Sequence, residues 1–203
     1  MSDSAGIGEA SERPRHFLWR KPRTRWLLGI PVGGFLLFFV GVAAWAGFNA
    51  GLKYSDTLQF CESCHEMRDN IVSGYEEGPH YKNMAGVRAV CADCHVPHAF
   101  FPKMQIKIQK AFNEIPKWAL GTLDTPEKFR AVQLELAERV WARMKSTDSR
   151  ECKNCHSLEA MDLSAQDASA AKKHVKERML ARNETCIDCH KGVGHSLPSG
   201  YEE

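Results

Sequence analysis

The hydrophobic and polar positions divide the chain into two unequal parts. Residues 26–52 form 27 consecutive positions without a charged side chain, and most of them are apolar. At about 1.5 Å of rise per residue, a helix of this length crosses the hydrocarbon core of a bilayer. Trp26 and Trp45 lie near its two ends, where amphipathic rings favour the membrane interface. The pattern therefore predicts one transmembrane helix, followed by a more polar body over residues 53–203.

A basic segment precedes the apolar run. The first 25 residues carry six basic side chains against three acidic ones, whereas the rest of the chain carries 21 bases and 22 acids. Positive charge stays on the cytoplasmic side of a membrane helix, so we expect residues 1–25 in the cytoplasm and the body outside it. This tail gives no reason to expect nucleic acid binding. A cleaved signal peptide is the alternative, because residues 44–46 resemble a cleavage site, but the apolar run exceeds the roughly 7–15 residues of a signal core.

Two amphipathic helices are predicted inside the body. Thr125 is a suitable N-cap, and Pro126 fits the first position of a helix that continues to Ser146. A second, basic amphipathic helix is predicted over residues 102–115, ending near Pro116. The first helix has an apolar stripe that predicts packing against the rest of the body, formed by Phe129, Val132, Leu136, Val140 and Met144.

Every cysteine in the chain belongs to one repeated pentapeptide, C-x-x-C-H. The four copies read CESCH, CADCH, CKNCH and CIDCH, and none of the eight cysteines is left over. A disulfide framework would need no histidine after each pair, and two four-cysteine zinc sites would leave four adjacent histidines unexplained. C-x-x-C-H is instead the attachment signature of haem c, in which two thiols form thioethers with the porphyrin. The pattern predicts four covalently bound haem groups, attached through Cys61, Cys64, Cys91, Cys94, Cys152, Cys155, Cys186 and Cys189.

Four haem groups would also supply much of the core of the body, because each is large, planar and tethered at two sulfurs. We therefore predict a mainly α fold with little sheet, short helices and long haem-wrapping loops. Haem c is attached outside the cytoplasm, which agrees with the orientation expected from the basic tail.

The motifs fall into two pairs around a long insert. The first cysteines of motifs 1 and 2 are 30 residues apart and those of motifs 3 and 4 are 34 apart, whereas 61 residues separate motifs 2 and 3. Each second motif has one further histidine upstream and one downstream, namely His80 and His98 in one case and His174 and His195 in the other. We therefore predict two related dihaem halves joined by a helical insert, at about 53–100, 148–203 and 101–147 respectively.

These additional histidines are candidates for the second axial ligand of a haem iron. A residue five positions after a motif histidine is too close in sequence to reach the opposite face of the same haem. His195 is therefore expected to serve a different haem from that of His190. Such cross-ligation would tie the halves together and bring haem edges close, as fast electron transfer requires. A surface role stays open for any one of them, above all for His98, and His16 is excluded because it precedes the anchor.

The order of these features resembles one known family. A basic tail, one anchor, and the segments CESCHEM, CADCHVPH, GTLDTPEKF and CIDCHKGVGH resemble the NapC/NirT family of membrane-anchored tetrahaem quinol dehydrogenases, from the anchor to Leu197. The resemblance implies a single-pass protein of the bacterial inner membrane with its haem domain in the periplasm. It further implies that the protein oxidises membrane quinol and passes the electrons to a periplasmic reductase, in the branch that serves nitrate reductase.

The resemblance also implies a set of iron ligands. In structurally described relatives the methionine of C-x-x-C-H-x-M binds the first haem iron. In this chain that methionine is Met67, which would bind in place of His65. A thioether is a weaker donor than an imidazole and raises the haem potential. The other face of the fourth haem differs between relatives and can be filled from a partner protein. The remaining implied ligands are His95 and His195 at the second haem, His156 and His80 at the third, and His190 at the fourth, with His174 as the internal candidate for its other face.

The resemblance places a quinol site on the predicted basic helix. The family's quinol-site lysine and acid fall on Lys107 and Glu114, which follow His95 by twelve and nineteen residues. From spacing alone, this pair is no more than a solvated helix face. With the resemblance, Lys107 would orient a quinol oxygen and Glu114 would accept a proton. The acid is an aspartate in the relative that defines the site, so the longer Glu114 is a departure that leaves its reach to the first haem open.

Two other function classes compete with a quinol dehydrogenase. A terminal reductase with an open haem would favour a C-x-x-C-K motif or a large catalytic domain, and neither occurs in this sequence. A passive electron carrier would differ only in lacking the quinol site. Within the first class, the partner is a nitrate reductase or, alternatively, a nitrite or other periplasmic reductase. Relatives also form homo-oligomers or larger assemblies with their reductase.

Overall fold

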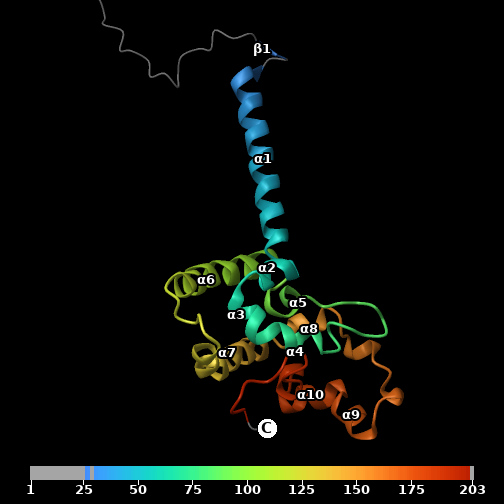
Figure 1. The fold of residues 1–203 in the computed structure, drawn as a ribbon. Coiled ribbons are helices and arrows are strands. Elements are labelled where there is room, and N and C mark those ends of the chain that lie inside the picture. The colour runs from blue at the N-terminus through green and yellow to red at the C-terminus, as the bar shows by residue number, and fades with distance from the viewer. Residues whose placement is uncertain (1–25, 28–29, 202–203) are drawn as a thin grey trace, which may run out of the picture. The chain divides into compact units, whose positions relative to one another are not determined.

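The computed structural model describes residues 26–27 and 30–201, so the predicted cytoplasmic tail lies outside the described residues. The chain divides into two compact units, with the boundary between Ala50 and Gly51. Figure 1 shows the described elements as a ribbon coloured along the chain. The described residues are mainly helical, which confirms that part of the sequence prediction, and the strands among them contain two residues each.

The long apolar helix, α1 (Val32–Tyr54), contains 23 residues. Before it, β1 (Trp26–Leu27) pairs antiparallel with β2 (Ile30–Pro31), so the helix begins later than the apolar run does. Pro31 directly precedes α1 and has no N–H to donate, which makes it poorly suited to a helix interior. The segment Gly33–Tyr54 is long and apolar enough to cross a membrane.

The second unit, from Gly51 onward, consists of helices joined by loops. Two of its helices are long: α6 (Phe100–Ala119) contains 20 residues and α7 (Pro126–Ser146) contains 21. The other described elements are α2 (Leu58–Glu62), α3 (His65–Met67), the π-helix η2 (Arg68–Val72), α4 (Ser73–Glu76), α5 (Cys91–His95), α8 (Arg150–Lys153), the 3₁₀-helices η3 (Leu158–Ala160) and η4 (Leu163–Ala165), α9 (Ala168–Lys173), α10 (Lys176–Arg182) and α11 (Cys186–Cys189).

The helix α7 begins where the sequence predicts. Thr125 Oγ1 accepts a hydrogen bond from the backbone N–H of Lys128 at 3.4 Å, and Pro126 occupies the first helical position. Phe129 and Met144 at the two ends of the apolar stripe are buried. The stripe therefore faces the rest of the unit, and its middle positions, which are Val132, Leu136 and Val140, are half-buried.

The helix α6 extends further than the sequence predicts. It continues through Pro116 and ends at Ala119. Pro116 lies close to the C-terminal end of the helix, where its missing N–H removes a single helical hydrogen bond. Its carbonyl oxygen still accepts the backbone N–H of Leu120 at 3.0 Å. The helix therefore ends three residues beyond Pro116, near which the sequence predicted its end.

Few apolar side chains are fully buried in the described part of the chain. So small an apolar core agrees with the expectation that bound macrocycles contribute to the packing. The buried apolar residues are Tyr75, Ala92, Phe129, Met144, Met179 and Ile187.

A buried hydrogen bond joins the third motif to the fourth. Ser149, the residue before α8, is fully buried, and its Oγ accepts the backbone N–H of Ile187 in α11 at 3.1 Å. Asp148 and Ser149 have φ angles of 53° and 47°, a left-handed conformation that is uncommon for residues with a side chain. These two residues turn the chain out of α7 and into the helix that carries the third motif.

Candidate functional site

The two pairs of motifs bring their cysteines together in the same way. The thiol of Cys61 in α2 lies close to that of Cys91 in α5, and this proximity lowers the pKa of Cys61 and raises the pKa of Cys91. The thiols of Cys152 in α8 and Cys186 in α11 are likewise close, which lowers the pKa of Cys186 and raises the pKa of Cys152. In each pair, the first cysteine of one motif lies beside the first cysteine of the next.

The second motif of each pair also folds in the same way. Asp93 Oδ2 accepts the backbone N–H of Val90 at 2.8 Å, and Asp188 Oδ2 accepts the backbone N–H of Thr185 at 2.7 Å. An aspartate at this place satisfies a free N–H at a helix start and favours the dipole there. Both short helices therefore begin at the first cysteine of their motif, with the following residue, Ala92 or Ile187, buried.

Six of the described histidines form three pairs of neighbouring rings, two of them nearly parallel and the pair of His80 and His156 nearly perpendicular. Two imidazoles on opposite sides of one metal ion hold their nitrogens about 2 Å from it, so their ring centroids lie about 6 Å apart. The observed centroid separations are close to this value in each pair, and the Nε2 atoms of His174 and His190 lie 3.5 Å apart. The ring centroids are 6.2 Å apart in His80 and His156, 6.3 Å in His95 and His195, and 5.8 Å in His174 and His190.

Three of these histidines are oriented by hydrogen bonds at Nδ1. His80 Nδ1 donates to the carbonyl oxygen of Val193 at 2.9 Å, and His195 Nδ1 lies 3.2 Å from the carbonyl oxygen of Ser196. His174 Nδ1 lies 2.6 Å from Gln166 Oε1. Because an oxygen acceptor requires the proton on Nδ1, the lone pair of Nε2 is left free for a metal. Metal-binding histidines are commonly held in this way.

Burial keeps two of the motif histidines neutral, which is the form that binds a metal. Burial, reinforced by the charges of His195 and Arg143, lowers the pKa of His95 to about 4. Burial and the nearby His174 and His156 also lower the pKa of His190. The pairs that contain His80 and His95 each join one predicted half to the other, whereas His174 and His190 both belong to the second half.

The first motif differs from the other three. His65 and His98 are the two described histidines outside the three pairs. His65 Nδ1 lies 3.3 Å from Glu66 Oε2, and His98 Nε2 lies 3.8 Å from Asp93 Oδ1. Met67 is half-buried in the same short helix as His65. The surroundings of the first motif therefore do not provide a second imidazole from the described residues.

The two residues of the predicted quinol site both lie on α6, seven positions apart, and each has another partner. Lys107 Nζ lies 2.8 Å from Asp56 Oδ1 and 2.7 Å from Ser55 Oγ. Glu114 Oε1 instead lies 3.3 Å from Lys110 Nζ, one helical turn away on an exposed part of α6. Lys107 and Glu114 share a helix but no contact.

Sequence reasoning missed Asp56, which also binds Lys103 Nζ at 2.8 Å. Burial disfavours the ionised carboxylate, but hydrogen bonds from Lys103 and Lys107 outweigh burial and lower the pKa of Asp56 below its ordinary value. The position of Asp56 was the available signal, because it is the first acidic residue after the apolar run. A spacing of four residues also places Lys103 and Lys107 on the same face of a helix.

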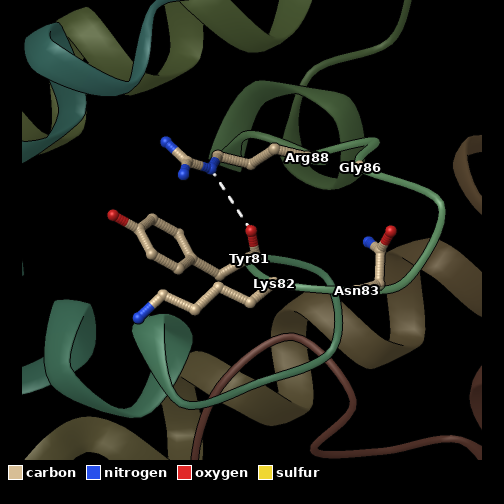
Figure 2. Close-up of a pocket in the computed structure, with 5 residues that line it drawn as sticks. All are labelled: Tyr81, Lys82, Asn83, Gly86 and Arg88. Carbon is tan, nitrogen blue, oxygen red and sulfur yellow. Dashed lines mark hydrogen bonds between the residues drawn. The ribbon is translucent and has the colours of Figure 1, made fainter.

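A pocket of about 350 Å³ is lined by residues of the loop between His80 and α5. Figure 2 shows the Arg88 side chain above the Tyr81 ring, with Arg88 Nε donating to the Tyr81 carbonyl oxygen at 3.3 Å. The guanidinium carbon lies 4.0 Å from the ring centroid, within the range of a cation–π contact. These contacts stabilise the loop that carries His80.

Comparison with known proteins gives a consistent result. The family model described as "NapC/NirT cytochrome c family, N-terminal region" matches residues 23–200. Cytochrome c-type protein NapC of Escherichia coli (strain K12) is 46% identical over 201 residues, which cover 97% of this chain and 98% of the relative. Denitrification system component NirT of Stutzerimonas stutzeri is 48% identical over 188 residues, or 92% and 90% of the two chains. Cytochrome c-type protein NapC of Paracoccus pantotrophus is 48% identical over 170 residues, or 83% and 69%. No solved structure gives a significant match.

The C-x-x-C-H motifs, the paired imidazoles and the apolar helix together define a c-type cytochrome with a segment able to anchor it in a membrane. The family match covers most of the chain, and relatives of this identity extend over almost its whole length. The chain therefore belongs to the NapC/NirT cytochrome c family, which confirms the family predicted from its motifs.

Proposed function

We propose that this protein takes electrons from membrane quinol and passes them to a periplasmic reductase, with nitrate reductase as the first candidate. The three histidine pairs beside the haem-attachment motifs carry the proposal, and membership of the NapC/NirT family supports it. The helix α1 would span the bacterial inner membrane once, with the basic tail in the cytoplasm and residues 53–203 in the periplasm.

Four haem c groups are the proposed electron carriers, each attached through the two cysteines of its motif. Haem iron accepts and donates single electrons when bound, and the protein sets its ligands, spacing and solvent access. The Nδ1 contacts described above fix the ring orientation of three ligands. The proposed axial pairs are His95 with His195, His80 with His156, and His174 with His190.

At the first motif we propose Met67 as an axial ligand in place of His65. One observation supports this choice: His65 belongs to none of the three histidine pairs. A thioether ligand raises the potential of the haem, which favours the acceptance of an electron from quinol.

The proposed quinol site lies along α6 and includes Lys107 and Glu114. Lys107 is near the first motif, since its charge contributes to the lowered pKa of Cys61. Asp56 and Ser55 hold its Nζ, so Lys107 is oriented to donate a hydrogen bond to a quinol oxygen. Glu114 would accept a proton released as quinol is oxidised. Asp56 acts through Lys107 and is therefore a positioning residue.

Reduction of the purified full-length protein in lipid nanodiscs tests this function. A menaquinol or ubiquinol analogue is expected to reduce the haem irons, as followed by their absorbance spectrum. A quinol-site inhibitor should prevent this reduction. Glu114→Gln should slow the reduction about 100-fold. Mass spectrometry should show that all four haem groups stay attached in this variant. The matched control is Glu135→Gln on the exposed face of α7, which should behave as the wild type. A protein that dithionite reduces but no quinol reduces would be a passive carrier, and the proposed quinol oxidation would be wrong.

The partner is tested with the quinol-reduced protein and purified periplasmic nitrate reductase. A nitrite reductase is the second candidate, because NirT, at 48% identity, is named a denitrification system component. We expect faster electron transfer to nitrate reductase. Transfer to nitrite reductase alone would replace the first candidate with the second.

A further inference from the structure

The helix α6 presents its apolar face outward. Four large apolar side chains spaced along one face of the helix are exposed, with Phe101 at 83% and Phe112 at 78%. The opposite, charged face contains Lys103 and Lys107, whose side chains are only 21% and 18% exposed because both bind Asp56. The exposed apolar face, defined by Phe101, Ile108, Phe112 and Ile115, is called the α6 apolar face below.

This orientation is the reverse of that found in a surface helix of a soluble protein. Such a helix buries its apolar stripe and turns its charged side chains to water. A large exposed apolar patch marks a surface that another apolar phase or molecule covers. The α6 apolar face therefore needs a partner outside the described part of the chain.

The haem groups of this chain do not suit that role. The first motif lies on the side of Lys107, which is near enough to Cys61 to affect its thiol, and Lys110 is near enough to His95 to affect its imidazole. Both lysines lie on the charged side of α6. The α6 apolar face is turned away from these motifs.

Lipid is the partner that chain continuity favours. Asp56, which holds Lys103 and Lys107, follows the last residue of α1 by only two positions. The same short stretch carries two exposed aromatic residues in contact, Tyr54 at 61% and Phe60 at 43%, with ring centroids 5.7 Å apart. The charged face of α6 is thus tied to the chain immediately after the membrane-length helix.

The ends of α6 carry residues typical of a membrane interface. Trp118 near its C-terminal end is 58% exposed, and Phe100 at its start is 48% exposed. Lys110 lies on its polar side with 54% of its side chain exposed, within reach of anionic headgroups. Aromatic rings and lysines flanking an apolar face are the pattern of a helix that lies in the interface plane.

We propose that α6 is an interfacial helix whose apolar face lies in the membrane leaflet on the side of the haem domain. The apolar side chains would enter the boundary between headgroups and acyl chains, to a depth of about 5–10 Å. The proposal relies on the membrane anchoring described under the proposed function, but not on quinol oxidation. It gives the domain a second attachment to the bilayer besides α1.

Photolabelling of the full-length haem-loaded protein tests this proposal. The protein is placed in nanodiscs of phosphatidylethanolamine and phosphatidylglycerol that contain a phosphatidylcholine with a diazirine in its acyl chain. Illumination should attach lipid to α1 and to the tryptic peptide covering residues 111–117 of α6. Labelling of α1 alone would overturn the proposal and leave the anchor intact. Absence of label from both would overturn the anchoring as well.

Paired variants identify the face. The double substitution Ile108→Glu with Phe112→Glu should abolish lipid labelling of α6 and leave labelling of α1 unchanged. The control Gln109→Glu with Asn113→Glu adds the same charge at neighbouring exposed polar positions and should keep the α6 label. Equal labelling of α6 in both variants would contradict the proposed face. Haem content, measured by mass spectrometry, confirms that each variant is assembled. If a variant does not assemble, the wild-type labelling pattern alone decides whether α6 contacts lipid.

Discussion

The helices α6 and α7 follow each other in one insert and have almost equal length, yet they use their apolar faces in opposite ways. In α7 the apolar stripe is turned inward, and Phe129 and Met144 are each only 7% exposed. In α6 the apolar face is turned outward, and the lysines of the charged face are held against the protein by Asp56. Amphipathicity alone therefore does not say which face meets the protein. In α6 the position of a half-buried counter-ion, Asp56, determines which face meets the protein.

The largest expected effect separates the two helices by their contribution to stability. Phe129→Ala in α7 should lower the free energy of unfolding by about 3–5 kcal/mol, because it removes a buried ring and leaves a cavity. Phe112→Ala in α6 should change it by no more than about 0.5 kcal/mol, because this ring makes few contacts within the protein. Guanidinium unfolding in detergent, followed by haem circular dichroism, measures both. Similar losses for the two variants would contradict the comparison.

An intermediate effect is expected from the counter-ion that fixes α6. Asp56→Asn removes two ion pairs with partly buried lysines and should lower the free energy of unfolding by about 1–2 kcal/mol at pH 7. In the proposed quinol site it should also raise KM for quinol more than it lowers kcat, since Lys107 loses its orientation. Asp124→Asn is the control, because Asp124 forms an exposed ion pair with Lys128.

The pH dependence of that effect has a defined sign. The pKa of Asp56 is lower in the folded protein than its ordinary value of 3.8. The stabilisation is therefore fully present above this ordinary value and is lost as the pH falls through the folded-state pKa. The stability difference between wild type and Asp56→Asn should be constant from pH 5 to 7 and shrink below about pH 4. A difference that grows on acidification would be incompatible with this assignment.

The smallest expected effect concerns the two helix starts. Thr125 caps α7 through its Oγ1, so Thr125→Ala should lower the free energy of unfolding by about 1 kcal/mol. The residue before α6 is Ala99, which has no capping side chain. Ala99→Ser should therefore add up to about 1 kcal/mol, as measured by the same denaturant titration. A null result for both would show that packing, and not capping, sets these helix boundaries.

Local patterns account for the features that the sequence predicted correctly. The N-cap at Thr125, the proline at the next position and the inward stripe of α7 all depend on residues within a few turns of one another. The continuation of α6 beyond Pro116 was not predicted, because a proline near a helix end removes only one hydrogen bond. The inward orientation of Lys107 was missed because its partner, Asp56, lies 51 residues away in the chain.

The histidine pairs show how far spacing can reach. The distance from His190 to His195 is short enough to exclude a shared haem, and this reasoning alone indicated that His195 serves another motif. Spacing did not identify the motif, and the pairing of His195 with His95 came from the family resemblance. The structure brings these two rings together, while ligation of an iron by them stays a proposal.

The pairing of histidines across the two halves has a consequence for biogenesis. His195 follows His95 by 100 residues, so the proposed ligand pair at the second motif is complete only after residue 195 has been synthesised. Haem attachment at the second motif can therefore precede completion of its proposed ligand pair. Under the proposed ligand set, a chain interrupted between the two predicted halves would contain the cysteines of the early motifs but would lack one ligand of each cross-half pair.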